Sequence, residues 1–427
     1  MAEEIIVIEG GSPLQGTVSV SGAKNSALKL MAASLLGRGT SRIDNVPLIS
    51  DIDIMAEVLR RLGATVEREG HSLLIDTAPV DSYQTPYELV SKMRASISVL
   101  GALIGRFGKA CVAMPGGCQI GARKIDMHLV GLQALGVEFN MEHGNLHAST
   151  PRGLHGAEVV LDFPSVGATE NLLMAAVVAE GRTVLGNAAR EPEIVDLANM
   201  LNAMGACISG AGSALIEVEG VPLQSMHPCT HTTVGDRIEA GTFLVGGALT
   251  GGPVTVRGVD PAFLRMALMK LDSMGCSVEV GDDHVTVSRS RALVPTDIQT
   301  LPHPGFPTDL QAQFMLLASC AEGMSVITEN VFENRFMFAS ELARMGADIA
   351  IEDHHAIVRG SCALQGADVS STDLRAGAAL VLAGLAAEGQ TRVHKVQHID
   401  RGYEDYVGKL RSLGARVSRR AADASGR

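Results

Sequence analysis

The sequence lacks the long apolar runs that a membrane protein needs. Its longest ones, such as "AALVLAGLAAEG", fall well short of the roughly 20 residues of a transmembrane helix. We expect no secretory leader, because the start "MAEEIIVIEG" is acidic where a signal peptide would be basic. These absences predict a cytoplasmic protein that has no membrane partner.

Paired cysteines are also absent. The seven cysteines form no CxxC motif, and their odd number argues against a disulfide framework. We expect free thiols that lie mostly in the core. His227, Cys229 and His231 match no zinc-binding spacing, so we interpret that segment as a polar linker. We expect neither a metal ion nor a cofactor.

Positive charge is scarce, because 35 Lys and Arg face 47 Asp and Glu and the formal net charge is −12. This balance disfavours a nucleic-acid partner. An anionic small-molecule substrate would therefore have to be attracted by a local cluster of basic side chains. The length of 427 residues and the hydrophobic content of 46% allow two or three domains with proper cores.

The sequence does contain an internal repeat. A helix-like segment that ends in Leu-Gly or Met-Gly and runs into a short strand occurs six times, for example as "LRRLGATVE" and "LRSLGARVS". The spacing of about 70 residues indicates one supersecondary module that is used six times. We expect these helices to be amphipathic, to lie on the surface and to end in a glycine with positive φ. The glycines are Gly63, Gly136, Gly205, Gly275, Gly346 and Gly414.

Each repeat also contains a helix that is apolar nearly all round, such as "TDLQAQFMLLASCAEG". A helix without a polar face belongs inside a core. All six begin with polar residues, and several helix starts that converge on one cleft would bind anions through their amide groups and dipoles. The polar residues concerned are Lys24, Asn25, Arg94, Thr169, Glu170, Arg237, Glu239, Asp309, Asp373 and Arg375.

Two simpler explanations of these residues stay open. Thr308 and Asp309 have the residue types of an ordinary helix cap. Lys24 and Arg94 oppose the helix dipole, which suggests a nearby bound anion, but an ion pair with a carboxylate would also explain them.

The periodicity breaks near "VPLQSMHPCTHTTVGDR", after the third repeat. Three repeats therefore lie on each side, and we predict one domain over residues 24–232 and a second over residues 1–23 and 233–427. The opening segment precedes the first buried helix, so we expect it to complete a sheet of the second half. We expect the end, "SRRAADASGR", to be a loose tail.

Longer motifs make the pattern more specific: "SGAKN", "MRASI", "PGGCQIGAR", "NAAREPEIVDLANMLNAMGA", "FPTDLQAQ", "VFENRFMFASELARMGA", "TDLRAGAALVLAGL" and "HIDRGYE". With them the sequence closely resembles the UDP-N-acetylglucosamine enolpyruvyl transferases, also called 1-carboxyvinyltransferases, over essentially its whole length. The resemblance implies an α/β fold of two similar inside-out α/β barrel domains with the active site in the cleft between them. It also implies transfer of enolpyruvyl from phosphoenolpyruvate to the 3-hydroxyl of UDP-N-acetylglucosamine with release of phosphate, the first committed step of peptidoglycan precursor synthesis.

Both substrates of that family are anionic, so a site needs fixed cations, either bidentate arginines or compact lysine charges. By resemblance, phosphoenolpyruvate is bound by Lys24, Asn25, Arg123, Arg335, Arg375 and Arg401. UDP-N-acetylglucosamine is expected to contact Asn25, Arg94, Arg123, Lys124, Ile125, Asp126, Met127, Ser165, Val166, Asp309 and Val331.

Addition of the sugar hydroxyl requires a base for the hydroxyl and an acid for C3 of phosphoenolpyruvate. The resemblance assigns the base to Asp309 and the acid to Cys118, with Lys24 and Arg401 as further catalytic residues. Cys118 is flanked by glycine in "PGGCQIGAR", so its loop is able to move. In the family this cysteine can add to phosphoenolpyruvate and is alkylated by the epoxide fosfomycin.

The sequence departs from the family pattern at few places. Lys124 and Ile125 stand where many relatives have Pro-Val, and Phe163 stands where some have lysine. These differences bear on the nucleotide contacts and leave the reaction untouched. Two alternatives stay open: enolpyruvyl transfer to shikimate 3-phosphate, whose Ser-Lys-Ser signature is replaced here by Ala23-Lys24-Asn25, and a non-catalytic nucleotide-sugar-binding paralogue.

Overall fold

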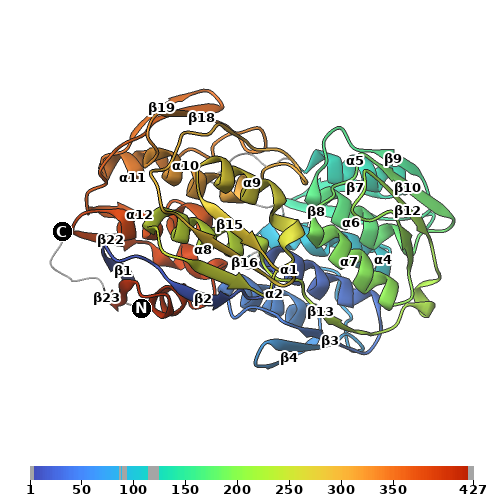
Figure 1. The fold of residues 1–427 in the computed structure, drawn as a ribbon. Helices are drawn as coiled ribbons and strands as arrows, with labels where there is room; N and C mark the ends of the chain where they lie inside the picture. Colours follow the sequence, from blue (N-terminus) through green and yellow to red (C-terminus); the bar gives the residue numbers. More distant parts are fainter. Residues whose placement is uncertain (1–3, 86–87, 89–93, 114–124, 422–427) are drawn as a thin grey trace. The chain divides into compact units, whose positions relative to one another are not determined.

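The computed structural model describes residues 4–85, 88, 94–113 and 125–421. These residues form two compact units. We call residues 22–113 and 125–234 the amino-terminal unit, and residues 4–21 and 235–421 the carboxy-terminal unit (Figure 1). Each unit has its own hydrophobic core, as a domain requires. In the described part of the chain, no helix has both the length and the apolar character needed to cross a bilayer.

The amino-terminal unit alternates buried helices, strands and outer helices. Its helices are α1 (Lys24–Ala33), α2 (Ser50–Arg61), α4 (Leu100–Phe107), α5 (Asp126–Ala134), α6 (Val166–Ala176) and α7 (Pro192–Ala203), with 3₁₀ turns η1 (Ser34–Leu36), η2 (Arg94–Val99) and η3 (Leu223–Ser225). Its strands are β3 (Thr40–Asp44), β4 (Thr65–Glu69), β5 (Ser72–Asp76), β6 (Lys109–Ala113), β7 (Glu138–Glu142), β8 (Asn145–Ser149), β9 (Glu158–Val160), β10 (Arg182–Gly186), β11 (Cys207–Ser209), β12 (Leu215–Glu219) and β13 (Thr230–Thr232).

The carboxy-terminal unit repeats this alternation and adds two strands from the start of the chain. Its helices are α8 (Arg237–Thr250), α9 (Arg265–Ser273), α10 (Gln311–Ser319), α11 (Ala339–Arg344), α12 (Leu374–Ala386) and α13 (Tyr406–Ser412), with η4 (Pro261–Leu264), η5 (Thr308–Leu310) and η6 (Val396–Arg401). Its strands are β1 (Glu4–Glu9), β2 (Gly16–Ser19), β14 (Val254–Arg257), β15 (Ser277–Val280), β16 (His284–Ser288), β17 (Ile298–Gln299), β18 (Met324–Thr328), β19 (Asp348–Glu352), β20 (His355–Arg359), β21 (Asp368–Ser370), β22 (Gln390–His394) and β23 (Arg416–Ala421).

The six repeats give six small sheets with the same strand order. In each sheet the strand after the buried helix pairs with an inner antiparallel strand, which pairs in turn with the strand after the outer helix. Five sheets also have a parallel edge strand. The sheets are β13-β3-β5-β4, β6-β8-β7, β9-β10-β12-β11, β2-β14-β16-β15, β17-β18-β20-β19 and β21-β22-β1-β23.

The first residues of the chain complete two sheets of the carboxy-terminal unit, as the sequence predicted. Strand β2 is the parallel edge of the fourth sheet, and β1 is the inner strand of the sixth. The predicted loose tail is wrong for residues 418–421, because they belong to β23 and pair with β1. The segment interpreted as a linker also contains a strand, β13, which pairs with β3.

The glycines that mark the repeats end the outer helices as expected. All six have positive φ, between 91° and 105°, where a side chain would be strained. The expected surface position is wrong for one of these helices, α7. Eight of its 12 residues are buried, because α7 packs against both α1 and α6.

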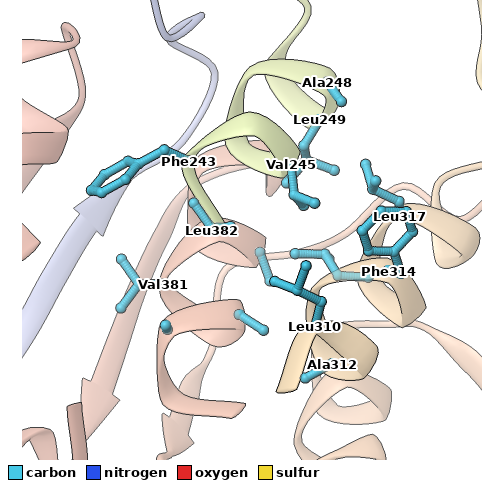
Figure 2. Close-up of a cluster of buried hydrophobic side chains, with 14 of the residues drawn as sticks. Phe243, Val245, Ala248, Leu249, Leu310, Ala312, Phe314, Leu317, Val381 and Leu382 are labelled. Atoms are coloured by element: carbon cyan, nitrogen blue, oxygen red, sulfur yellow. The ribbon is translucent and has the colours of Figure 1, made fainter. Parts of the chain in front are cut away.

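The apolar helices lie in the cores, as predicted. All nine residues of α10 are buried, and α8, α10 and α12 pack against one another around Phe243, Phe314 and Leu382 (Figure 2). Small residues permit this packing, since a Cβ atom on Gly241 of α8 would lie 2.6 Å from Leu310 Cδ1.

The described cysteines are all free. Cys111 and Cys276 are buried, and the half-buried Cys229, Cys320 and Cys362 pack against the hydrophobic cores. Among the described cysteines only Cys207 is exposed, so the prediction of core thiols is wrong for that residue. Cys118 lies outside the described residues.

Candidate active site

In the carboxy-terminal unit, the Asp309 carboxylate lies between two guanidinium groups. Arg335 Nη2 donates a hydrogen bond of 2.7 Å to Oδ1 of Asp309, and Arg375 Nε lies 3.5 Å from Oδ2. The Asp309 side chain is 24% exposed, whereas the Arg335 and Arg375 side chains are 6% and 4% exposed. A solvent-accessible carboxylate is thus held by two buried cations, which favour its ionised form.

The Arg375 guanidinium retains donors that the described part of the chain does not satisfy. Its Nε and Nη1 atoms are buried without a hydrogen-bond acceptor there, so the contact of Nε with Asp309 is one of charge alone. Burial opposes the charge, but Tyr403 and Asp309 raise the pKa of Arg375 above its ordinary value. Arg375 is therefore a permanent buried cation suited to an anionic group.

Arg401 and Val331 lie on two segments that pack near Asp309, Arg335 and Arg375. Arg401 ends η6, which packs against α12, and a Cβ atom on the following Gly402 would lie 2.7 Å from Leu374 Cδ2. Val331 is half-buried, and its backbone N–H donates to Glu329 Oε1 at 2.8 Å. The structure thus gathers Asp309, Val331, Arg335, Arg375 and Arg401 around the starts of η5 and α12.

A cavity lies beside the same segment. It has a volume of about 230 Å³ and is lined by Arg237, Arg265, His303, Phe263 and Pro307, among others. Pro307 directly precedes Thr308, so the cavity adjoins the turn that carries Asp309.

In the amino-terminal unit, Lys24 is the first residue of α1 and is buried. Its Nζ lies 2.7 Å from Oδ2 of Asp51, a carboxylate that is only 1% exposed. The ion pair weighed for Lys24 is therefore present. Asn25 is exposed beside it, and Ser26 donates to Asp196, whose carboxylate also accepts from His231 Nε2 at 2.7 Å.

The predicted nucleotide-binding segments lie at the starts of two packed helices. Ile125 is buried and precedes α5, Asp126 is exposed, and Met127 is half-buried. Ser165 and Val166 begin α6, which packs against α5 through a contact of 3.0 Å between His128 Nδ1 and Asn171 Nδ2. The structure therefore brings the two segments together.

Four predicted residues have no described side chain. Arg94 begins η2, but its side chain is outside the described part, and Cys118, Arg123 and Lys124 lie wholly outside the described residues.

At three of the polar helix starts a side chain caps the first amide groups. Asp236 and Asp373 each accept two amide hydrogen bonds at the starts of α8 and α12, and Ser165 accepts one at α6. Those amides are already used within the protein. At the turn that carries Thr308 and Asp309 the N-cap residue is Pro307, which makes no side-chain cap hydrogen bond, while Thr308 donates to Glu329 and Asp309 accepts from Arg335.

The sequence did not predict two buried carboxylates that contact the candidate site residues. Asp51 is one, and Glu329 is another, with Thr300, Thr308, Val331 and Phe332 all donating to it. Glu329 lies two residues before the motif "VFENRFMFASELARMGA", yet nothing in its neighbours along the chain shows that it meets Thr308.

Comparisons with known proteins identify the family. A family model described as EPSP synthase (3-phosphoshikimate 1-carboxyvinyltransferase) matches residues 8–410. A UDP-N-acetylglucosamine 1-carboxyvinyltransferase of Corynebacterium jeikeium (strain K411) is 53% identical over 417 residues, which cover 98% of this chain and 99% of that protein.

Solved structures agree with the predicted fold class. The enolpyruvyl transferase NikO from Streptomyces tendae has a TM-score of 0.89 and 30% identity, covering 99% of this chain and 100% of that one. EPSP synthase from Acinetobacter baumannii has a TM-score of 0.74 at 17% identity, covering 98% and 100%, and so shares the fold alone. The two-domain α/β fold is confirmed. Since the likeness to the Corynebacterium enzyme spans nearly all of both chains, this chain belongs to the UDP-N-acetylglucosamine 1-carboxyvinyltransferases, an enzyme family of the enolpyruvyl transferase fold.

Proposed function

We propose that this enzyme transfers the enolpyruvyl group of phosphoenolpyruvate to the 3-hydroxyl of UDP-N-acetylglucosamine and releases phosphate. The acceptor is the one named for the relative that is 53% identical. The reaction supplies the first committed precursor of peptidoglycan and thereby serves cell-wall synthesis and cell division. The proposal places this reaction in the cytoplasm.

The observation that carries the proposal is the placement of Asp309 against Arg335 and Arg375. A general base must be ionised and accessible, and this carboxylate is both flanked by cations and partly exposed. The buried cations beside it suit a substrate that has a phosphate and a carboxylate, because buried charge-assisted hydrogen bonds to such groups are strong. The proposed base, Asp309, therefore lies next to the proposed anion subsite at Arg335 and Arg375.

The chemistry proceeds in two stages. In the addition, Asp309 accepts the proton of the sugar 3-hydroxyl while the oxygen attacks C2 of phosphoenolpyruvate, and Cys118 delivers a proton to C3. In the elimination, C3 loses a proton, the C2–C3 double bond re-forms and the phosphate leaves from C2. Acid and base must be different groups, since one gives a proton while the other takes one.

The two substrates use different sets of side chains. Lys24, Arg123, Arg335, Arg375 and Arg401 neutralise phosphoenolpyruvate, and Asn25 lies beside Lys24. UDP-N-acetylglucosamine is held by Asn25, Arg94, Arg123, Lys124, Ile125, Asp126, Met127, Ser165, Val166, Asp309 and Val331. The packing of α5 against α6 supports this assignment, because it brings the starts of the two nucleotide segments into one neighbourhood.

The two units act as the two domains of the enzyme, residues 24–232 and residues 1–23 with 233–427. Each unit carries only part of the machinery, with Lys24 in one and Asp309 in the other. Neither unit alone is therefore expected to be active.

A second acceptor follows from the description of the family model, which names 3-phosphoshikimate. Against it, the residues around Lys24 read Ala-Lys-Asn, and the solved EPSP synthase is only 17% identical. UDP-N-acetylglucosamine is therefore the favoured acceptor.

A phosphate-release assay separates these functions. The purified chain is incubated with phosphoenolpyruvate and either UDP-N-acetylglucosamine or shikimate 3-phosphate. We expect phosphate and an enolpyruvyl product with the nucleotide sugar only. Release with shikimate 3-phosphate would reverse the choice of acceptor, and release with neither would favour a non-catalytic binding protein.

A further inference from the structure

Glu329 follows directly after β18 and is only 3% exposed. Both oxygens of its carboxylate accept hydrogen bonds. Its Oε1 atom accepts hydrogen bonds from the backbone N–H groups of Val331 and Phe332, at 2.8 and 3.1 Å, and from the Thr300 hydroxyl at 2.9 Å. Its Oε2 atom accepts from the Thr308 hydroxyl at 2.8 Å. A buried carboxylate is tolerated only with such a set of donors.

Thr308 links this carboxylate to the Asp309 cluster. Its hydroxyl has one proton, and because that proton points to Glu329, the oxygen must act as an acceptor toward Arg335. Arg335 Nη1 does donate to Thr308 Oγ1, at 2.9 Å, while Nη2 of the same guanidinium donates to Asp309 at 2.7 Å. The Glu329 carboxylate thus orients the Thr308 hydroxyl so that its oxygen is free to accept from Arg335, the residue that also donates to Asp309.

The same carboxylate also shapes the segment that carries Val331. Two consecutive N–H groups of this segment converge on Oε1, and Arg335 leans over the Phe332 ring, with Cζ 5.2 Å from the ring centre. One side chain therefore holds two separate parts of the site in fixed relation.

We propose that Glu329 is a positioning residue for the transfer reaction, which fixes Arg335 against Asp309 through Thr308 and at the same time fixes the Val331 segment. The inference rests on the proposed function, because it takes Asp309 as the base and Arg335 and Val331 as substrate contacts. Glu329 itself touches no reacting atom and acts through its neighbours.

Glu329→Gln is the informative change because it keeps the shape and removes the charge. A glutamine has one acceptor oxygen, so its amide nitrogen must face either Thr308 or the backbone donors. If it faces Thr308, the hydroxyl can no longer donate there and turns toward Arg335, which displaces the guanidinium. A displacement of about 1 Å in an active site can cost about a hundredfold in rate. We therefore expect kcat to fall about 10- to 100-fold.

The experiment measures kcat, both KM values and the thermal unfolding midpoint for Glu329→Gln, Thr308→Val, Thr308→Ser and the double variant Glu329→Gln/Thr308→Val. Thr308→Val should lose as much kcat as Glu329→Gln, and Thr308→Ser should recover most of that loss because it restores the hydroxyl. The double variant should be no worse than either single variant, since both interrupt one chain of hydrogen bonds. Asp297→Asn is the control, because Asp297 accepts a hydrogen bond from the backbone N–H of Val326 at an exposed position beside the same sheet.

Three results would overturn the inference: kcat within threefold of wild type in Glu329→Gln, losses that multiply in the double variant, or an equal loss in Asp297→Asn. If Glu329→Gln fails to fold, the comparison of Thr308→Val with Thr308→Ser decides alone, and equal activity of these two refutes the role. Asp309→Asn separates this failure from that of the proposed function. An inactive Asp309→Asn beside a normal Glu329→Gln refutes only the positioning role, whereas an active Asp309→Asn refutes the function assigned to Asp309.

Discussion

Around Lys24 in the amino-terminal unit each cation has a carboxylate of its own, whereas around Asp309 in the carboxy-terminal unit two guanidinium groups share one carboxylate. Lys24 pairs with Asp51, and Lys29 pairs with Glu170, which is so buried that its pKa is raised despite that partner. Arg335 and Arg375 both approach Asp309. Because both units are built from the same module, this difference arises from individual side chains and not from the backbone plan.

The starts of the buried helices differ in the same way. Helices α8 and α12 begin with Asp236 and Asp373, whose carboxylates occupy the first amide groups. Helix α1 follows Ala23 and η5 follows Pro307, and neither start has a side-chain cap. Helix α4, which follows Val99, has no side-chain cap either. The repeated scaffold thus supplies equivalent helix starts at which the local residues differ.

The largest effect is expected for Asp309→Asn. An amide keeps the shape but cannot accept the proton, so turnover should fall by about 10²- to 10⁴-fold. Binding of UDP-N-acetylglucosamine, measured by calorimetry, should stay within about tenfold of wild type. Asp297→Asn serves as the control for removal of a carboxylate from the same unit. Turnover close to wild type would remove Asp309 from the role of base.

Lys24→Ala and Arg401→Ala test whether the two units share one substrate. Each should raise the KM for phosphoenolpyruvate by at least about tenfold, because buried contacts to a phosphate or carboxylate are strong, and change the KM for the acceptor far less. Lys270→Ala is a suitable control, since Lys270 contacts the backbone of Asp297 at an exposed position. Equal losses for both substrates would contradict the assignment of the subsites.

Fosfomycin labelling compares Cys118 with the six described thiols. We expect alkylation at Cys118 alone, because a nearby cation such as Arg123 of the same motif favours the thiolate. The labelling should be several-fold faster with UDP-N-acetylglucosamine present. Among the described thiols, Cys362 is the one most expected to compete with Cys118 for the label, because a hydrogen bond with the Cys320 side chain lowers its pKa. Peptide mass mapping decides the question, and adducts spread over several cysteines would contradict the assignment.

Cys118→Asp supplies the matched variant for this labelling. A carboxylic acid can also deliver a proton, so substantial activity should remain while covalent inactivation is lost. An aspartate variant that fosfomycin still inactivates covalently would show that the reactive group lies elsewhere.

The smallest effect concerns stability alone and arises from the Glu239–Lys409 pair of the carboxy-terminal unit. Burial raises the pKa of Glu239 from 4.5 to about 7, against the attraction of Lys409. The carboxyl therefore contributes stability below pH 4.5 that is lost as the pH rises to about 7, corresponding to about 3 kcal/mol at most.

Glu239→Gln should remove this dependence. The unfolding midpoint of wild type minus that of the variant should be highest near pH 5 and should decrease toward pH 8. Glu322→Gln, at an exposed position in the same unit, should show no such trend. A difference that is flat with pH, or that increases, would contradict the raised pKa.

The members of the Asp309 cluster could be named from the sequence because each lies in a recognisable motif. Asp309, Arg335 and Arg375 come from three separate motifs, and the structure joins them within 3.5 Å. The carboxylates that hold the site could not be predicted in this way. Asp51 and Glu329 lie in ordinary sequence contexts, and their partners are distant along the chain or are backbone amides.

The sequence by itself determined the number of repeats, the apolar helices and the six helix-ending glycines, because local spacing and the φ preference of glycine act within a few residues. Only the tertiary structure decided the rest. The polar end of the chain became β23 because β1, about 400 residues earlier, offers it hydrogen-bond partners, and α7 became buried because two other helices cover it. The Asp309 cluster likewise depends on Glu329 and Thr308 meeting across 21 residues of chain. Such partners are selected by packing in three dimensions, which leaves no periodic trace in the sequence.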